Sequence, residues 1–175
     1  MKNPEEIFEI LKKEFNDAII SLDKELPTEL IISVDPLHIN KIGKFLRDNE
    51  ELKFDSLMCL SGVDDANGTK IKDETGLETI QGGTLSVYYH LHSVELKHKI
   101  TLKVSTPRED AKAESVENIW KCANWHEREA FDLFGIIFLN HPDLRRILMP
   151  YDWEGYPLRK DYKNPEFYEG MKVPY

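Results

Sequence analysis

Acidic and basic side chains are concentrated in residues 125–135, where their types could support acid–base chemistry or paired charges. General acid–base catalysis by two carboxyl groups requires that both groups reach one substrate. If this stretch is a helix, Glu127 and Glu129 point about 200° apart, because each residue turns a helix by about 100°. Arg128 and Asp132 stand four residues apart and therefore share a helical face. The spacing favours paired charges over a carboxylate dyad.

The same stretch contains candidate metal ligands. His126-Glu127 resembles the start of the His-Glu-x-x-His zinc site, but Ala130 stands where the second histidine would lie. His126 and Glu129 are three residues apart and could share a metal, yet no further ligand has suitable spacing. The two cysteines of the chain match no Cys-x-x-Cys motif, so this chain alone is not expected to build a zinc ribbon or an iron–sulfur cluster. We therefore expect no metal or other cofactor in this chain.

His141 is a further candidate for chemistry. Its side chain could transfer a proton, because the unperturbed imidazole titrates near neutral pH. No nucleophile or orienting partner is identifiable beside it in the sequence, so a hydrogen-bonded histidine in a turn is the favoured interpretation. We therefore predict no catalytic residue here.

Basic residues interleaved with aromatic residues follow, and such a stripe could bind nucleic acid. They are Arg145, Arg146, Arg159 and Lys160. The formal net charge of -9 opposes a polyanionic partner. Arginine also pairs well with carboxylates, because its guanidinium donates two parallel hydrogen bonds. We expect internal or inter-chain ion pairs and no nucleic acid.

Capping residues and periodicity predict the elements that position these side chains. Asn3 and the residues that follow predict a first helix, Asp35-Pro36 predicts a second that ends near Asn49, and Gly135 ends the helix of residues 125–134. Alternating apolar residues predict an antiparallel pair of strands at 85–91 and 94–104. Further strands are expected at 18–22, 29–34 and 54–63, whereas residues 64–83 are predicted to form a loop. The apolar side of the sheet requires a cover, and the two early helices are available for it.

These elements predict an α+β fold, in which helices cover an antiparallel or mixed sheet. Its domain comprises residues 1–139 and includes the helix of the charged stretch. Residues 140–175 are rich in proline and aromatic residues, which favours an extended C-terminal segment. Aromatic side chains on an extended segment are costly in water, so we expect residues 140–175 to dock on another subunit, and folding back on their own domain is the alternative.

Length and composition limit the class of protein. The chain has 175 residues, 41% of them hydrophobic, which suits one core of ordinary size. It contains no apolar run of about 18 residues and no signal-peptide pattern at its start. We therefore expect a cytoplasmic protein without a membrane span.

The charged stretch and its flanks resemble a known family. Glu127-Arg128-Glu129, Asp132, His141, Arg145 and Ile147-Leu148 have the order and spacing of the signature of the C subunit of NADH-quinone oxidoreductase. This is the small hydrophilic subunit of respiratory complex I. The preceding residues 123–125 and the later stretches 141–149 and 155–162 also resemble the family.

The resemblance implies a cofactor-free structural subunit in the cytoplasmic arm of a proton-translocating NADH:quinone oxidoreductase. Such a chain belongs to an enzyme without being catalytic itself. It docks on the quinone-site D subunit beside the B subunit, and it lies peripherally on the cytoplasmic side of the inner membrane, with indirect membrane contact. FMN and iron–sulfur clusters are expected in partner subunits, with NADH and quinone as substrates of the complex. The alternative is the equivalent module of a related membrane-bound hydrogenase.

The family pattern assigns structural and docking roles, and no catalytic roles, to one set of residues. These are Glu127, Arg128, Glu129, Asp132, Phe134, Gly135, His141, Asp143, Arg145, Arg146, Arg159, Lys160 and Asp161.

Overall fold

The computed structural model describes residues 2–24, 30–72 and 78–173. These residues form three α-helices, α1 (Pro4–Phe15), α2 (Ile39–Asp48) and α3 (Ala123–Phe134), with short 3₁₀ turns at Asn16–Ala18 and Arg108–Asp110. The start of α1 follows the predicted capping pattern, because Asn3 Oδ1 accepts the Glu6 N–H and Glu6 Oε2 accepts the Asn3 N–H, both at 2.8 Å. No helix in the described ranges is long and apolar enough to span a bilayer.

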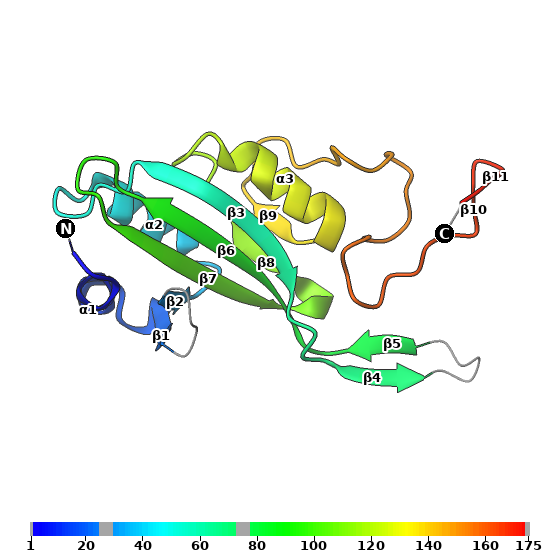
Figure 1. Ribbon diagram of the computed structural model, residues 1–175, viewed down its shortest axis with the longest axis horizontal. Coiled ribbons are helices and arrows are strands. Elements are labelled where there is room, and N and C mark those ends of the chain that lie inside the picture. The colour runs from blue at the N-terminus through cyan, green and yellow to red at the C-terminus, as the bar shows by residue number, and fades with distance from the viewer. Residues whose placement is uncertain (1, 25–29, 73–77, 174–175) are drawn as a thin grey trace.

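The central sheet has five strands in the order β1-β2-β7-β6-β3 (Figure 1). Their bounds are β1 (Ile19–Asp23), β2 (Ile31–Val34), β3 (Ser56–Asp64), β6 (Thr84–His92) and β7 (Lys99–Pro107). The predicted pair β6–β7 is antiparallel, with Val87 opposite Val104 and Tyr89 opposite Leu102. Its second strand starts at Lys99 and not at residue 94 as predicted, because residues 93–98 form the turn between the two strands. The β2–β7 pair is parallel and the remaining pairs are antiparallel, so the predicted mixed α+β fold is confirmed.

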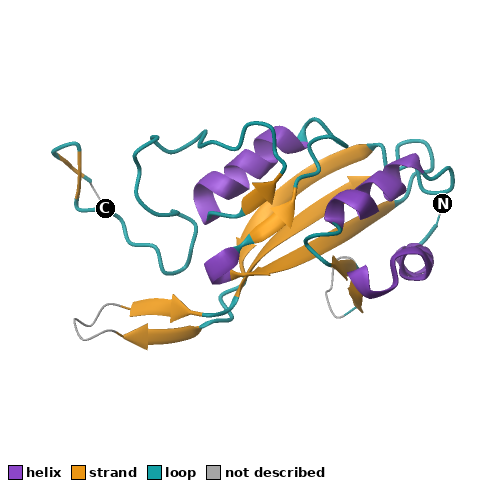
Figure 2. Cartoon of the chain, turned by 180° about the vertical axis from the view of Figure 1, so that it is seen from behind, coloured by secondary structure: helices purple, strands orange, loops and turns teal. Residues whose placement is uncertain are grey.

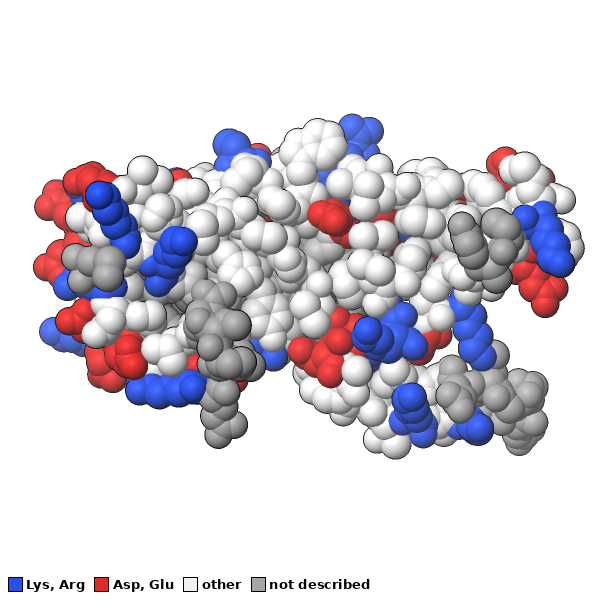
Figure 3. Space-filling view, viewed as in Figure 1, with Lys and Arg blue, Asp and Glu red and all other residues white. Residues whose placement is uncertain are grey.

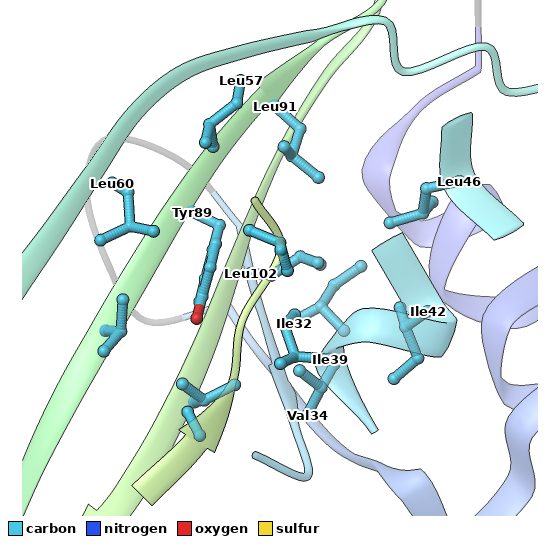
Figure 4. Close-up of a cluster of buried hydrophobic side chains, with 14 of the residues drawn as sticks. Ile32, Val34, Ile39, Ile42, Leu46, Leu57, Leu60, Tyr89, Leu91 and Leu102 are labelled. Atoms are coloured by element: carbon cyan, nitrogen blue, oxygen red, sulfur yellow. The ribbon is translucent and has the colours of Figure 1, made fainter. Parts of the chain in front are cut away.

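One face of the sheet carries the core. The inward residues of β6, Leu85, Val87, Tyr89 and Leu91, are fully buried, and Figure 4 shows side chains from the sheet and α2 meeting in the same cluster. Seen from behind, α2 and α3 lie in front of the strands (Figure 2). The other face points toward the viewer in Figure 1, and Figure 3 shows few charged side chains over its centre. The two early helices were predicted to cover the apolar face, and both contribute side chains to the core cluster, while α3 packs on the same face as well.

Two other predictions were also wrong. Residues 64–83 are not a single loop, because β4 (Thr69–Lys72) and β5 (Glu78–Gln81) pair as a hairpin that projects from the end of the sheet (Figure 1). The second helix starts at Ile39 and not at Pro36, because Asp35 Oδ1 accepts the Leu37 N–H and forms a turn first. The predicted strand at 29–34 begins in the described part at Ile31, and residue 29 lies outside the described residues.

Smaller elements complete the fold. β8 (Lys112–Glu114) and β9 (Ile137–Leu139) form a parallel pair that links the residues before and after α3. Residues 140–173 are turns and irregular backbone, apart from the short hairpin of β10 (Phe167–Tyr168) and β11 (Met171–Lys172). Figure 1 shows this last hairpin away from the sheet.

The contact between α3 and β3 depends on Gly62. A Cβ atom at this position would lie 2.7 Å from Phe134 Cδ2 and 3.3 Å from Ala130 Cβ. We therefore expect Gly62→Ala to lower the free energy of unfolding by about 1–3 kcal/mol, through overpacking. Urea denaturation followed by circular dichroism measures the change. Ser61→Ala is the control, and equal stability of the two variants would contradict the prediction.

Candidate functional site: the charged network around helix α3

Helix α3 buries some of its charged side chains in the domain and exposes others to solvent. It ends as predicted at Gly135, whose φ of 72° is the left-handed conformation that glycine adopts without strain. Glu127 is completely buried against the domain, whereas Glu129 is exposed. The predicted separation of these two carboxylates is therefore confirmed, and they do not form a dyad.

Glu127 is held by neutral donors. Its Oε1 accepts the Val116 N–H at 2.7 Å and its Oε2 accepts the Ser115 Oγ–H at 2.6 Å. Burial raises the pKa of Glu127 from its ordinary value of 4.5 to about 7, although both hydrogen bonds act in the opposite direction. Burial thus favours the protonated form of this carboxyl group.

The imidazole ring of His141 lies close to the buried carboxyl group of Glu127. Its Nε2 is 3.9 Å from Glu127 Oε2 and 3.3 Å from the Asn124 carbonyl oxygen, and its side chain is fully buried. Its Nδ1 accepts the Asp143 N–H at 3.0 Å, which places the ring hydrogen on Nε2. Burial and the negative charge of Glu127 also raise the pKa of Tyr89 well above its usual value. The interpretation of His141 as a hydrogen-bonded turn histidine agrees with this geometry.

Asp132 organises the segment that follows the helix. Its Oδ2 accepts the backbone N–H groups of Ile147, Leu148 and Met149 at 2.7–2.9 Å. Its Oδ1 accepts Arg146 Nη1 at 2.8 Å, and Asp132 is completely buried. Burial by itself would raise the pKa of Asp132, but the three N–H groups and Arg146 outweigh it and lower the pKa. Asp132 therefore works as an anion that binds a turn of main chain.

Arg128 does not bind Asp132, so the pairing suggested by their spacing was wrong. Its Nε donates to the Arg145 carbonyl oxygen at 3.3 Å, and its guanidinium lies 4.9 Å from the centre of the Trp125 ring. Asp132 instead takes Arg146, which lies 14 residues away in sequence. The side chain of Arg145 is exposed and bonds Asp143 at 3.0 Å, also at the surface.

Residues 156–161 return to the C-terminal end of α3. The Leu158 N–H donates to the Leu133 carbonyl oxygen at 3.1 Å, and Arg159 Nε donates to the Phe134 carbonyl oxygen at 2.6 Å. Two guanidinium groups lie near the centre of the Tyr156 ring, that of Arg159 at 4.6 Å and that of Arg146 at 5.4 Å. These contacts satisfy carbonyl groups that the end of a helix leaves free.

A second ionic cluster was missed in the sequence. Arg108 is buried and bonds both Asp64 and Asp161, and Asp64 Oδ2 also accepts the Lys160 N–H at 2.8 Å. Burial would raise the pKa of Asp64, but Arg108 and two backbone N–H groups lower it. Asp64 and Arg108 stand 44 residues apart, at the ends of β3 and β7. The available signal was that each follows a predicted strand of the same sheet.

The structure brings most of the predicted residues together within the chain, as internal supports of α3 and residues 141–161. Glu129 is the exception on the helix. It lies in a groove of about 280 Å³ beside β3, with His126, Leu133 and Leu158. Within the described ranges, no group of three or more His, Cys, Asp or Glu side chains is arranged to hold a metal. The buried charged groups of α3 bind the main chain of residues 116, 145 and 147–149 and the side chains of Ser115 and Arg146, so they hold the neighbouring segments on the helix.

Comparison with known proteins identifies the family. Residues 32–168, which are more than half of the chain, match the family described as respiratory-chain NADH dehydrogenase, 30 Kd subunit. The chain belongs to this family. It is also 40% identical over 168 residues to the C subunit of NADH-quinone oxidoreductase from Chlorobium phaeobacteroides, and the match covers 96% of this chain and 93% of the relative. It is 44% identical over 171 residues to the same subunit of Chloroherpeton thalassium, where the match covers 96% of this chain but spans only 64% of the relative.

Solved structures share the fold of this 30 Kd subunit family member. A trypsin-resistant fragment of Nqo5 aligns with a TM-score of 0.57 and 23% identity, over 80% of this chain and 98% of the fragment. A chain of the membrane-bound sulfane sulfur reductase, an archaeal respiratory membrane complex, aligns with a TM-score of 0.60 and 20% identity, over 91% of this chain and 85% of that chain. The family resemblance inferred from the charged stretch is confirmed.

Proposed function

We propose that this chain is a cofactor-free structural subunit of the cytoplasmic arm of a proton-translocating NADH:quinone oxidoreductase. In this proposal it docks on the quinone-site D subunit beside the B subunit and supports electron transfer from NADH to quinone. FMN and iron–sulfur clusters belong to partner subunits, and the chain reaches the membrane only through the complex.

One observation carries the proposal. The carboxylate of Asp132 is engaged by three main-chain N–H groups and Arg146. A carboxylate used in this way fixes the path of residues 146–149 and is not available to a substrate. Glu127 is likewise enclosed by Ser115 and Val116. The signature residues therefore support a precisely shaped surface, which is what a docking subunit requires.

Residues 140–175 are proposed to provide part of that surface. Exposed apolar and aromatic side chains follow one another along this segment, with Leu148 59%, Tyr151 92%, Phe167 60% and Met171 64% exposed. Residues 141–161 pack on α3 and Asp64, whereas the last hairpin contacts residues of the same segment, through the Trp153 and Tyr168 rings 5.0 Å apart. Exposed apolar surface of this kind marks a site of association.

Deletion of residues 164–175 tests this assignment. We expect the truncated chain to keep its cooperative thermal unfolding, because the described part of the deleted stretch, residues 164–173, contributes no side chain to the core cluster. We also expect weaker incorporation into the complex, since apolar contact area is lost. Differential scanning calorimetry and affinity isolation measure the two effects. Loss of cooperative unfolding would instead make the deleted residues part of the domain.

The proposal as a whole is tested by isolating the native assembly. Membranes of the source cells are solubilised gently, the complex is recovered through a tag on this chain, and its subunits are identified by mass spectrometry. We expect the D and B subunits together with FMN and iron–sulfur signals from the partners. Recovery of the chain without any oxidoreductase subunit would contradict the proposal.

A related respiratory complex is the second candidate. Its support is the fold shared with a chain of the membrane-bound sulfane sulfur reductase. A module of a related membrane-bound hydrogenase is the form of this alternative that the sequence suggests. The same isolation distinguishes the candidates, because the FMN-bearing and NADH-binding subunits are expected for NADH oxidation, and hydrogenase subunits for the alternative.

A further inference from the structure

The outer edge of strand β3 lacks the lysine, arginine and proline residues that often protect an edge strand. β3 ends the sheet order, so in the described part of the chain no strand pairs with its outer side. Its nine residues, Ser56–Asp64, include no lysine, arginine or proline, and the first charged residue is Asp64 at its end. Natural edge strands are commonly protected by such residues, because unpaired N–H and C=O groups attract other strands. β3 has one irregularity, a register shift between Leu57 and Cys59.

The opposite edge of the sheet is formed by β1, which is shorter and is contacted by a lysine. β1 has five residues, and Lys12 from α1 donates through Nζ to the Ile19 carbonyl oxygen at 2.7 Å. Near the start of β3, the Cys122 thiol lies 3.5 Å from the Leu57 carbonyl oxygen. The stretch from Cys59 to Gly62 instead borders the groove of about 280 Å³. This stretch is therefore the accessible part of the edge.

The exposed stripe of α3 forms the other wall of the groove. Glu129 lies there, and no Lys or Arg among the described residues comes within 4 Å of its carboxylate in a salt bridge. The other two acidic residues of the helix, Glu127 and Asp132, are fully enclosed by donors of this chain. Met58 on β3 and Trp125, one turn before Glu129, are 46% and 63% exposed. Residues 59–62 of β3 and the carboxylate of Glu129 thus line the same groove, together with Leu133 and Leu158.

We infer that an extended segment of a partner protein pairs with the edge of β3 at residues 59–62 and places a lysine or arginine on Glu129. The main-chain groups of β3 select an extended backbone, because strand addition satisfies N–H and C=O groups on both chains. The carboxylate selects the charge of the partner's side chain. This inference rests on the proposed function and specifies how the docking takes place.

Charge reversal at Glu129 tests the ionic part. Glu129→Lys is expected to reduce the amount of chain recovered in the complex by about tenfold, because like charges would then meet at the groove. Its unfolding midpoint should stay within about 3 °C of the unmodified chain, since the side chain is exposed. Glu9→Lys, an exposed change of equal charge on α1, is the matched control and should assemble normally. Normal recovery of Glu129→Lys would overturn the inference.

Hydrogen exchange tests the strand pairing. Amides of residues 57–63 are expected to exchange more slowly in the purified complex than in the isolated chain, by about tenfold or more. A photo-crosslinking amino acid at position 129 should link to an extended segment of another subunit that carries a basic residue. Equal exchange in both states, or a crosslink to a second copy of this chain, would overturn the inference. If the chain recovers no oxidoreductase subunit at all, the proposed function fails instead.

Discussion

Asp132→Ala is expected to lower the free energy of unfolding by about 3–5 kcal/mol at pH 7. The substitution leaves the N–H groups of Ile147, Leu148 and Met149 without their acceptor and removes the partner of Arg146. Each polar group left unsatisfied on burial costs about 1–3 kcal/mol, less where water reaches it. Urea denaturation followed by far-UV circular dichroism measures the loss. Residues 146–149 should also become more sensitive to limited proteolysis.

Two variants make this prediction specific. Asp132→Asn keeps an oxygen acceptor but loses the charge opposite Arg146. Its free energy of unfolding should therefore fall by less than that of Asp132→Ala. Asp143→Asn removes an exposed partner of Arg145 and should cost about 0–1 kcal/mol. The pKa of Asp132 is lowered in the folded chain, so its contribution is present above the ordinary aspartate pKa near 4 and is lost as pH falls through the folded pKa. Equal stability of Asp132→Ala and Asp143→Asn would contradict the anchoring role.

Local rules predicted the elements whose causes are local. Gly135 ends α3 because the residue after a helix takes a left-handed conformation that suits glycine. The strands β6 and β7 were visible because apolar residues alternate along both of them. The opposite directions of Glu127 and Glu129 followed from the helical repeat alone.

Local rules did not predict ion pairs between residues that are far apart in the sequence. Arg128 and Asp132 have a favourable spacing, yet Asp132 bonds Arg146, because residues 146–149 fold back over the helix and offer three N–H groups as well. The β4–β5 hairpin escaped notice because β4 is exposed along its whole length, so burial imposes no alternation of apolar residues on it. The Asp64–Arg108 pair depends on the sheet bringing the ends of two strands together.

The two buried carboxylates of α3 show why residue type alone does not define a role. Asp132 meets a guanidinium and main-chain N–H groups, and its pKa falls. Glu127 is buried with only one hydroxyl and one N–H as donors, and burial raises its pKa to about 7. One carboxylate therefore stabilises the fold as an anion, while the other stabilises it best when protonated. Their contributions to stability have opposite dependence on pH.

Glu127→Gln is expected to remove a pH dependence of stability of about 2–3 kcal/mol. Because the folded pKa of Glu127 is raised above its ordinary value of 4.5, its contribution is complete below pH about 4.5 and is lost as pH rises through about 7. Above pH about 7 the carboxylate must remain charged in a buried site with His141 Nε2 3.9 Å away. The neutral glutamine avoids this cost and still presents an oxygen to the Val116 N–H. Urea denaturation at intervals from pH 5 to pH 8 measures the difference.

Glu129→Gln is the control that separates the effect of burying a carboxylate from the effect of losing a negative charge. This control removes an exposed carboxylate from the same helix, so its stability should run parallel to that of the unmodified chain across the pH range. As pH rises from 5 to 8, the free energy of unfolding of the Glu127→Gln variant should increase relative to that of the unmodified chain, because only the unmodified chain must ionise a buried group. Asp132 cannot produce this trend, since a lowered pKa acts at acidic pH and in the opposite direction. Parallel profiles for Glu127→Gln and the unmodified chain would mean that Glu127 is ionised at little cost in its buried site.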